Sequence, residues 1–220
     1  MASLADTAPP RVLCIVENNN FEPLNSELQS IMSYSVQLFQ EPDLTTEQVH
    51  SMIDLLWLVW PNERQTAAEA ATQFIEQQKT SASHLRKLIY LIFDENEQVI
   101  AHAEGDLRIM FTPDGVQEVM ALGGVCTHPE KRGLGLGAAV VRAAFSRVDD
   151  GTFAVSVFQT PVADFYARLG SAICKNNTWV DRTNKESPEA HPWEPGEILM
   201  YYPASYDWPT GEIDINGEQY

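Results

Sequence analysis

The chain has 220 residues, 44% of them hydrophobic, and carries a formal net charge of −17 at pH 7. This length suits one domain with a sizeable core. A surface this acidic repels nucleic acid and anionic membranes, so we predict neither as a partner, whereas a cationic small molecule or peptide would be attracted to it.

The cysteines and the first residues bear on the compartment. The spacing of Cys14, Cys126 and Cys174 matches no metal-binding motif, and we predict no metal site. An odd number of cysteines suits a reducing compartment. Residues 1–10 have no basic segment, unlike a secretory signal, and no apolar run approaches the length of a membrane span. We expect a cytoplasmic protein, and a homodimer remains open.

The first elements are predicted after an extension, residues 1–30, that the pattern does not place. Residues 34–39 alternate between apolar and polar side chains, as a strand does. Thr45, with a glutamine three residues later, is a capping signal for a helix over residues 47–59, whose apolar side chains recur at helical spacing. An alanine- and glutamine-rich segment, residues 65–78, predicts a second helix.

Three strands follow, at residues 87–93, 98–110 and 117–127, joined by turns rich in Asn, Asp, Gly and Pro. Gly123 and Gly124 interrupt the third strand. Because glycine weakens a strand, a pair of them predicts a bulge or a close approach of a ligand to the backbone.

A glycine-rich turn connects the third of these strands to a helix predicted at residues 138–148. Its residues 132–137 read Arg-Gly-Leu-Gly-Leu-Gly. Glycines allow backbone N–H groups to converge on an anion, and the start of a helix favours negative charge. Arg132 adds a permanent cation suited to phosphate. The turn therefore predicts a phosphate-binding site.

Other interpretations of these glycines fit less well. A Walker loop needs Lys and then Ser or Thr after the last glycine, and two alanines stand there instead. The letters of a dinucleotide motif fit Gly133, Gly135 and Ala138, but a charged turn separates them from the strand, and no second strand–helix–strand unit is evident. A simple tight turn needs fewer glycines.

The rest of the chain predicts further short elements. They are a strand at residues 153–158, parallel to the strand at 117–127, a helix at 162–169, strands at 172–180 and 197–202, a loop at 181–195 and a tail at 203–220. Together the elements predict an α/β (α+β) fold with a mixed sheet.

Two segments resemble the GNAT N-acetyltransferases. Residues 127–137 (THPEKRGLGLG) are similar to that family's acetyl-CoA signature, and residues 159–170 (QTPVADFYARLG) to its later motif, in which Tyr follows an Asn by seven positions. The resemblance implies a mostly antiparallel sheet flanked by helices on both faces. It also implies an extension at 1–30, an acetyltransferase domain at 31–203 and a tail at 204–220.

By the same resemblance, the protein transfers an acetyl group from acetyl-CoA to an amine of a small molecule or peptide. A bulge in the third strand would let its backbone pair with pantetheine, and the glycine-rich turn would hold the phosphates. Gln159 stands where the family has its Asn. The implied acetyl-CoA contacts are Val125, Cys126, Thr127, Arg132, Gly133, Leu134, Gly135, Leu136, Gly137, Ala138 and Gln159.

The catalytic residues are predicted with the same comparison in view. Tyr166, in the later motif, would act as general acid toward the departing sulfur. Related aminoglycoside enzymes often carry a glutamate where this chain has Gly123, so the base must come from elsewhere. His102 and Glu104 are candidates. We take them to face opposite sides of their strand, expect at most one in the site, and favour Glu104, which could also bind a cationic acceptor.

Several alternatives remain open. Trp57 and Trp60 either contact the acceptor or pack between helix and sheet; packing is favoured for Trp57. The tail is faintly similar to that of aminoglycoside 2'-N-acetyltransferases, or is a disordered acidic segment. A GNAT-like protein that binds CoA as a sensor or scaffold, and a dinucleotide-dependent oxidoreductase, are the alternative functions.

Overall fold

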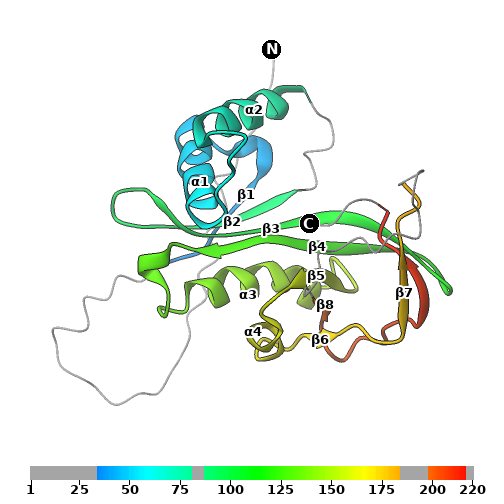
Figure 1. The fold of residues 1–220 in the computed structure, drawn as a ribbon. Coiled ribbons are helices and arrows are strands. Elements are labelled where there is room, and N and C mark those ends of the chain that lie inside the picture. The colour runs from blue at the N-terminus through cyan, green and yellow to red at the C-terminus, as the bar shows by residue number, and fades with distance from the viewer. Residues whose placement is uncertain (1–33, 81–86, 184–197, 217–220) are drawn as a thin grey trace, which may run out of the picture.

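The computed structural model describes residues 34–80, 87–183 and 198–216, and the predicted extension at residues 1–30 lies outside these ranges. Within them, a nine-stranded sheet forms the scaffold (Figure 1). Seven strands follow the order β1-β2-β3-β4-β5-β8-β6, and β9 joins by pairing with β3 and β7. No helix in the described part of the chain is both long and apolar enough to cross a membrane.

The first described elements are close to their predicted positions. They are β1 (Gln37–Gln40), the 3-10 helix η2 (Glu41–Asp43), α1 (Thr46–Val59) and α2 (Ala67–Thr80). The capping signal at Thr45 is confirmed. Its backbone N–H donates to Gln48 Oε1 at 2.9 Å, and the Gln48 N–H donates to Thr45 Oγ1 at 3.3 Å. This reciprocal pair satisfies two of the N–H groups that a helix start leaves unpaired.

The central strands form an antiparallel meander of β2 (Leu88–Phe93), β3 (Val99–Thr112) and β4 (Gly115–Thr127). The predicted bulge is confirmed. His102 pairs with Cys126, but Glu104 pairs with Gly123, so β4 contains one extra residue between these pairs. Gly124 has a φ of 59°, the left-handed conformation that suits glycine at a bulge.

The bulge changes which way the side chains of β4 face. Leu122 packs in the cluster around α3, whereas Cys126 packs in the cluster around α1 and α2. In a regular strand two residues four positions apart share a face. The extra residue at the bulge breaks that alternation, so β4 presents its even-numbered side chains to opposite faces before and after it.

After β4 the chain forms a helix on the other face of the sheet and then returns to the sheet as a strand beside β4. The next elements are the 3-10 helix η4 (Pro129–Lys131), α3 (Leu136–Asp149), β5 (Ser156–Thr160) and α4 (Ala163–Ala167). As predicted, β5 runs parallel to β4. It begins three residues later than predicted because the Phe153 N–H donates to the Arg147 carbonyl at 3.0 Å, which keeps that residue in the turn after α3.

The last strands differ from the prediction. The single strand predicted at residues 172–180 is wrong: it divides into β6 (Ala172–Ile173), beside β8 (Ile198–Tyr202), and β7 (Asn177–Val180), beside β9 (Gly211–Asp214). The break falls at Asn176, whose φ of 62° is incompatible with an extended strand.

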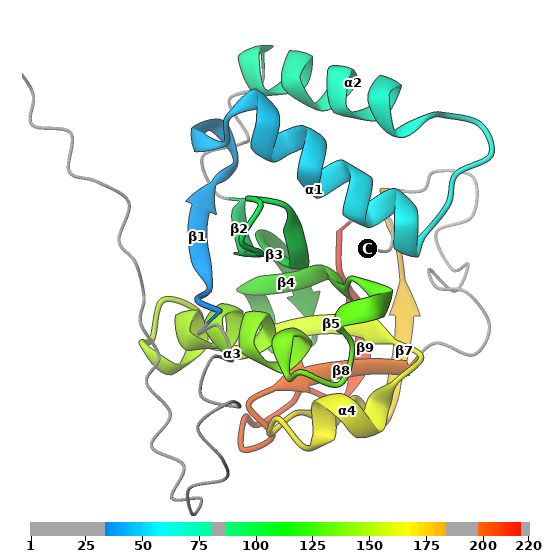
Figure 2. The same cartoon turned by 90° about the vertical axis from the view of Figure 1, so that its left-hand side faces the viewer.

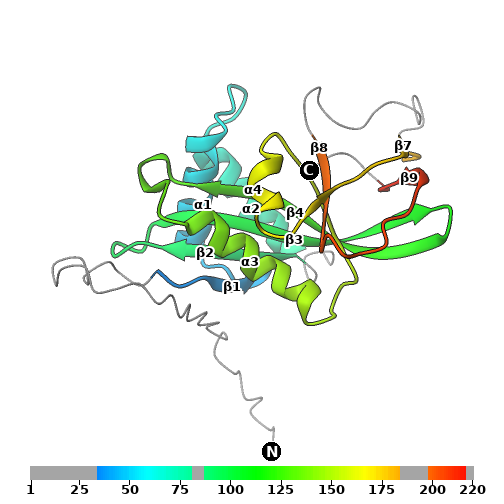
Figure 3. The same ribbon diagram turned by 90° about the horizontal axis from the view of Figure 1, so that it is seen from below.

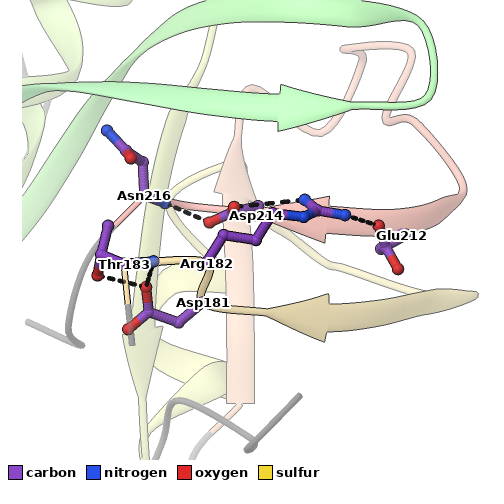
Figure 4. Close-up of polar contacts among 6 residues, drawn as sticks. All are labelled: Asp181, Arg182, Thr183, Glu212, Asp214 and Asn216. Carbon is purple, nitrogen blue, oxygen red and sulfur yellow. Dashed lines mark hydrogen bonds and ion pairs between the residues drawn. The ribbon is translucent and has the colours of Figure 1, made fainter. Parts of the chain in front are cut away.

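Residues of the predicted tail take part in the sheet, and Figure 4 shows how polar side chains join β9 to β7. Arg182, directly after β7, contacts Glu212 and lies 3.3 Å from Asp214 (Nη1 to Oδ2). Asp214 also accepts from the Asn216 N–H at 2.8 Å. The segment at residues 203–216 is therefore part of the fold rather than a disordered tail.

Helices cover both faces of the sheet. Figure 2 shows α1 and α2 above β2, β3 and β4, and Figure 3 shows α3 crossing the same strands on the opposite face. Separate apolar clusters form under α3, under α1 and α2, and between the β3–β4 hairpin and the last strands. The predicted mixed, mostly antiparallel sheet with helices on both faces is confirmed.

Candidate active site

A cleft opens where β4 and β5 separate. The two strands pair only at Met120 with Ser156 and Ala121 with Val157, and the following residues of each strand diverge. The gap has a volume of about 740 Å³. Its walls come from the end of α1, the bulged part of β4, the start of α3, and β5 with α4. The lining residues are Val59, Trp60, Leu122, Gly123, Gly124, Val125, Cys126, Thr127, Arg132, Gly137, Gln159, Thr160, Pro161, Val162, Phe165 and Tyr166.

The glycine-rich turn forms a second, adjoining hollow of about 290 Å³. Gly133 and Gly135 have φ values of 84° and 78°, and Gly135 is the N-cap of α3 without any side-chain hydrogen bond. The first N–H groups of α3 therefore have no side-chain cap from this position, and they lie beside Arg132, which lines both hollows. This combination suits an anionic ligand.

The structure brings most of the predicted acetyl-CoA contacts together, with one exception. Leu134 is 57% exposed and lines neither hollow. Gly137 lines both hollows, and a Cβ atom there would lie 3.2 Å from Thr127 Oγ1. The absence of a side chain at this position lets the start of α3 lie against the end of β4.

Tyr166 lines the cleft from α4. Its ring packs 4.5 Å from that of Phe158 and 4.8 Å from that of Phe165, measured between centroids. Burial raises the pKa of the Tyr166 phenol, so the hydroxyl keeps its proton at neutral pH. A protonated phenol in the cleft can donate a hydrogen bond or a proton to a sulfur anion.

Cys126 is also in the cleft wall, but its environment does not favour a nucleophile. Burial raises the pKa of its thiol to about 12, although nearby Arg132 acts in the opposite direction. At neutral pH the sulfur is a thiol, and the thiolate is the nucleophilic form. Cys126 is therefore not an activated nucleophile in this structure.

The two candidate bases lie together, and the prediction that they face opposite sides of the strand is wrong. Residues two positions apart in a strand share a face. His102 Nε2 and Glu104 Oε2 are 4.0 Å apart, both on the face covered by α1 and α2. Neither lines the cleft; both lie on β3, immediately behind the bulge in β4.

Lys87 completes this group, although its sequence position alone did not mark it as a site residue. Its Nζ lies 2.9 Å from Glu104 Oε2. Burial opposes the charge on Lys87, but Glu104 and other nearby carboxylates outweigh it, and the pKa of Lys87 lies above its usual value. The signal for this pair was a lysine at the start of one predicted strand and a glutamate on the next.

The two tryptophans at the end of α1 lie in different environments. Trp57 packs in the cluster under α1 and α2, and its Nε1 donates to the Gln65 carbonyl at 2.9 Å. Trp60 is 51% exposed and lines the cleft. Packing is therefore the role of Trp57, whereas Trp60 is placed where it can contact a ligand.

No group of three or more His, Cys, Asp or Glu side chains could hold a metal ion within residues 34–80, 87–183 and 198–216. The cleft thus lies between two separating parallel strands, beside the glycine-rich start of a helix. The family model described as an acetyltransferase (GNAT) domain matches residues 42–174, more than half of the sequence. The chain belongs to the GNAT acetyltransferase family, and its class is that of an N-acetyltransferase.

Solved structures show the same fold at low sequence identity. YhbS from Escherichia coli, a GNAT family N-acetyltransferase solved in complex with CoA, is 14% identical, with a TM-score of 0.55 over 83% of this chain and 89% of that one. The histone acetyltransferase HPA2 and related acetyltransferase from Corynebacterium glutamicum is 18% identical, with a TM-score of 0.51 over 78% and 97%.

A GCN5-related N-acetyltransferase from Kribbella flavida is a longer chain, of which this protein spans 34%, while the match covers 64% of this chain at 19% identity and a TM-score of 0.49. A search of curated proteins finds no matching sequence. The similarity of the tail to that of aminoglycoside 2'-N-acetyltransferases stays a prediction.

Proposed function

We propose that this protein transfers an acetyl group from acetyl-CoA directly to an amine of a small molecule or peptide. The observation that carries the proposal is the cleft itself. It collects the bulged backbone of β4, the uncapped start of α3 with Arg132, and the protonated Tyr166. The structure of YhbS with CoA shows that a protein of this fold binds such a ligand.

The residues around the cleft fit the parts of acetyl-CoA. Arg132 and the N–H groups of Gly133 to Ala138 would hold phosphate oxygens. The backbone of Val125, Cys126 and Thr127, freed from β5 by the separation of the strands, would pair with pantetheine amides. A backbone N–H of β4 could polarise the thioester carbonyl.

Tyr166 would donate its proton to the departing sulfur. A general base cannot be assigned in the cleft wall itself, because no carboxylate or imidazole lines the cleft among the described residues. Glu104, whose side chain is 29% exposed, would take the amine proton through water or attract a cationic acceptor. The overall acidity of the chain favours the same class of acceptor.

That lack of a base in the described cleft wall favours one second candidate. A protein with the same cleft but no base could bind CoA as a sensor or scaffold without turnover. The two candidates make the same binding prediction and differ in catalysis.

Calorimetric titration with acetyl-CoA, CoA and NAD tests the binding. We expect acetyl-CoA and CoA to bind and NAD not to bind. Arg132→Ala should weaken CoA about tenfold or more, because a hydrogen bond to a charged group contributes about 1.5–3 kcal/mol. Arg168→Ala, an exposed arginine beyond α4, is the matched control and should change nothing. Absence of acetyl-CoA binding would refute the proposal, and binding of NAD would point to hydride transfer.

A screen of amines for CoA release, starting with cationic ones, tests catalysis. Turnover with any amine, lost in Tyr166→Phe, supports the enzyme. Tight CoA binding with no turnover across the screen supports the sensor or scaffold.

A further inference from the structure

We propose that His102 is a positioning residue that fixes the bulge in β4 through the Gly124 carbonyl, and thereby sets the strand wall of the cleft. This inference rests on the proposed function in one respect, that the cleft holds the CoA thioester. His102 itself lies behind the wall and does not line the cleft.

The first support is a hydrogen bond. His102 Nδ1 lies 2.7 Å from the Gly124 carbonyl oxygen. A carbonyl oxygen only accepts, so Nδ1 must carry the hydrogen. Burial lowers the pKa of His102, against opposing effects of Glu104 and of this hydrogen bond, so the ring is neutral at pH 7. A neutral ring that donates from Nδ1 has only a lone pair at Nε2.

The second support is the shape of the contact. A Cβ atom on residue 124 would lie 2.7 Å from His102 Cε1 and 3.0 Å from Nδ1. Only a glycine therefore permits the imidazole to approach the backbone at this point. The φ of 59° at Gly124 requires the same residue independently. The bulge and the ring fit one another, and neither feature is explained by strand pairing alone.

The third support is that the other ring nitrogen has no comparable partner. Nε2 is buried without a hydrogen bond to any described group, and the nearest carboxylate oxygen, Glu104 Oε2, is 4.0 Å away. Glu104 is itself held by Lys87. The ring is 1% exposed, so it is enclosed on all sides. The hydrogen bond of the His102 ring in the described structure is therefore the one from Nδ1 to the Gly124 carbonyl.

The position of the bulge matters for the cleft because it determines which face of the sheet each of the following side chains points to. If the bulge were displaced by one residue, the side chains between its old and its new position would point to the opposite face of the sheet. Val125, Cys126 and Thr127, which line the cleft, come directly after it. His102 therefore acts on ligand binding through Gly124, without contact with the ligand.

Two variants of similar polarity test the inference. In His102→Asn the side-chain NH₂ can occupy the place of Nδ1, whereas in His102→Gln it reaches the place of Nε2. We expect His102→Asn to bind CoA within about twofold of the unchanged protein. We expect His102→Gln to bind about tenfold more weakly, as for the loss of one buried hydrogen bond. Melting temperatures of both variants show whether they remain folded.

Backbone ¹H–¹⁵N spectra without ligand provide a readout that does not depend on CoA. The amide shifts of residues 123–127 should move in His102→Gln and stay close to the original in His102→Asn. Equal effects of the two variants on these shifts and on affinity would overturn the inference, since His102 would then only fill space. A stronger effect of His102→Asn would also overturn it, by assigning the role to Nε2.

The histidine tautomer can be measured on the unchanged full chain. Long-range ¹H–¹⁵N correlation should show the His102 proton on Nδ1 at pH 7.5, and a proton on Nε2 alone would contradict the hydrogen bond to Gly124. This result stands even if both variants fail to fold. It also separates the two proposals, because failure of CoA binding in the unchanged protein would refute the function and leave the tautomer result intact.

Discussion

The ring of Tyr166 on α4 packs against that of Phe158 on β5, with centroids 4.5 Å apart and an interplanar angle of 43°. This contact joins the short helix to the strand that forms one side of the cleft. Because aromatic packing constrains the ring, the phenol is held at one place in the cleft wall. A fixed and protonated hydroxyl is what a general acid requires.

Replacing Tyr166 by Phe should therefore reduce turnover and spare binding. General acid catalysis contributes about 100-fold or more, so we expect kcat for acetyl transfer to fall by about that factor. CoA affinity should stay within about twofold, because the ring and its packing remain. Initial rates of CoA release and calorimetry measure the two effects.

Tyr206→Phe is the matched control, since the Tyr206 hydroxyl donates to Gln117 Oε1 at 2.8 Å, outside the cleft. Its rate of transfer should equal that of the unchanged protein. An equal loss in both variants would show that removal of a tyrosine hydroxyl acts through the fold.

Gly124→Ala should destabilise the protein more than a matched glycine elsewhere. Alanine in the left-handed conformation costs about 1–2 kcal/mol, and the clash with His102 adds about 1–3 kcal/mol. Gly151 has a φ of 79° and open space within 4 Å of the place a methyl group would take, so Gly151→Ala isolates the conformational part. Urea unfolding of both variants measures the loss in the free energy of unfolding. Equal losses would mean that His102 moves aside without an energetic cost.

The stability of the fold should fall as the pH decreases from 7.5 to 5.5. Burial lowers the pKa of His102 below its usual value of 6.5. Below that value the unfolded chain binds a proton that the folded chain excludes. The contribution of the neutral His102 to the free energy of unfolding is therefore complete above about pH 6.5 and is lost on acidification. The slope can reach about 1.4 kcal/mol per pH unit for one proton.

The matched variant for this prediction is His102→Asn, which cannot titrate. Its free energy of unfolding should depend less on pH over the same range, measured by urea unfolding at pH 7.5, 6.5 and 5.5. Identical pH dependence in the two proteins would show that other groups govern the effect.

Asp214 should contribute to the attachment of β9. Its buried carboxylate accepts from the Asn216 N–H and pairs with Arg182. Asp214→Ala leaves that N–H without its acceptor, and we expect a loss of about 1–3 kcal/mol in the free energy of unfolding. Glu212 contacts the same arginine but its side chain is 51% exposed, so Glu212→Ala should change the free energy by less than about 0.5 kcal/mol.

Much of the fold could be predicted because its signals are local. The capping pair at Thr45, the glycine-rich turn before α3 and the glycine pair in β4 each act within a few residues of chain. Their conformational requirements can be recognised without knowing the rest of the molecule. The predicted helices and central strands accordingly differ from the structure by only a few residues.

One correction, the shared face of His102 and Glu104, follows from strand geometry, because residues two positions apart in a strand share a face. The other features that the sequence did not settle depend on contacts between distant segments. The break between β6 and β7 depends on β8 and β9, which lie later in the chain. The separate roles of Trp57 and Trp60 depend on the Gln65 carbonyl and on the cleft. None of these follows from local pattern, because the partner is chosen by packing.

The sequence by itself determined the class of fold, the glycine-rich turn and the place of the bulge, because backbone conformation at glycines and helix starts is a property of short segments. Only the tertiary structure decided that His102 meets the Gly124 carbonyl and that Lys87 holds Glu104. These relationships depend on strand register, and register is fixed by the burial of whole faces of the sheet rather than by any one residue.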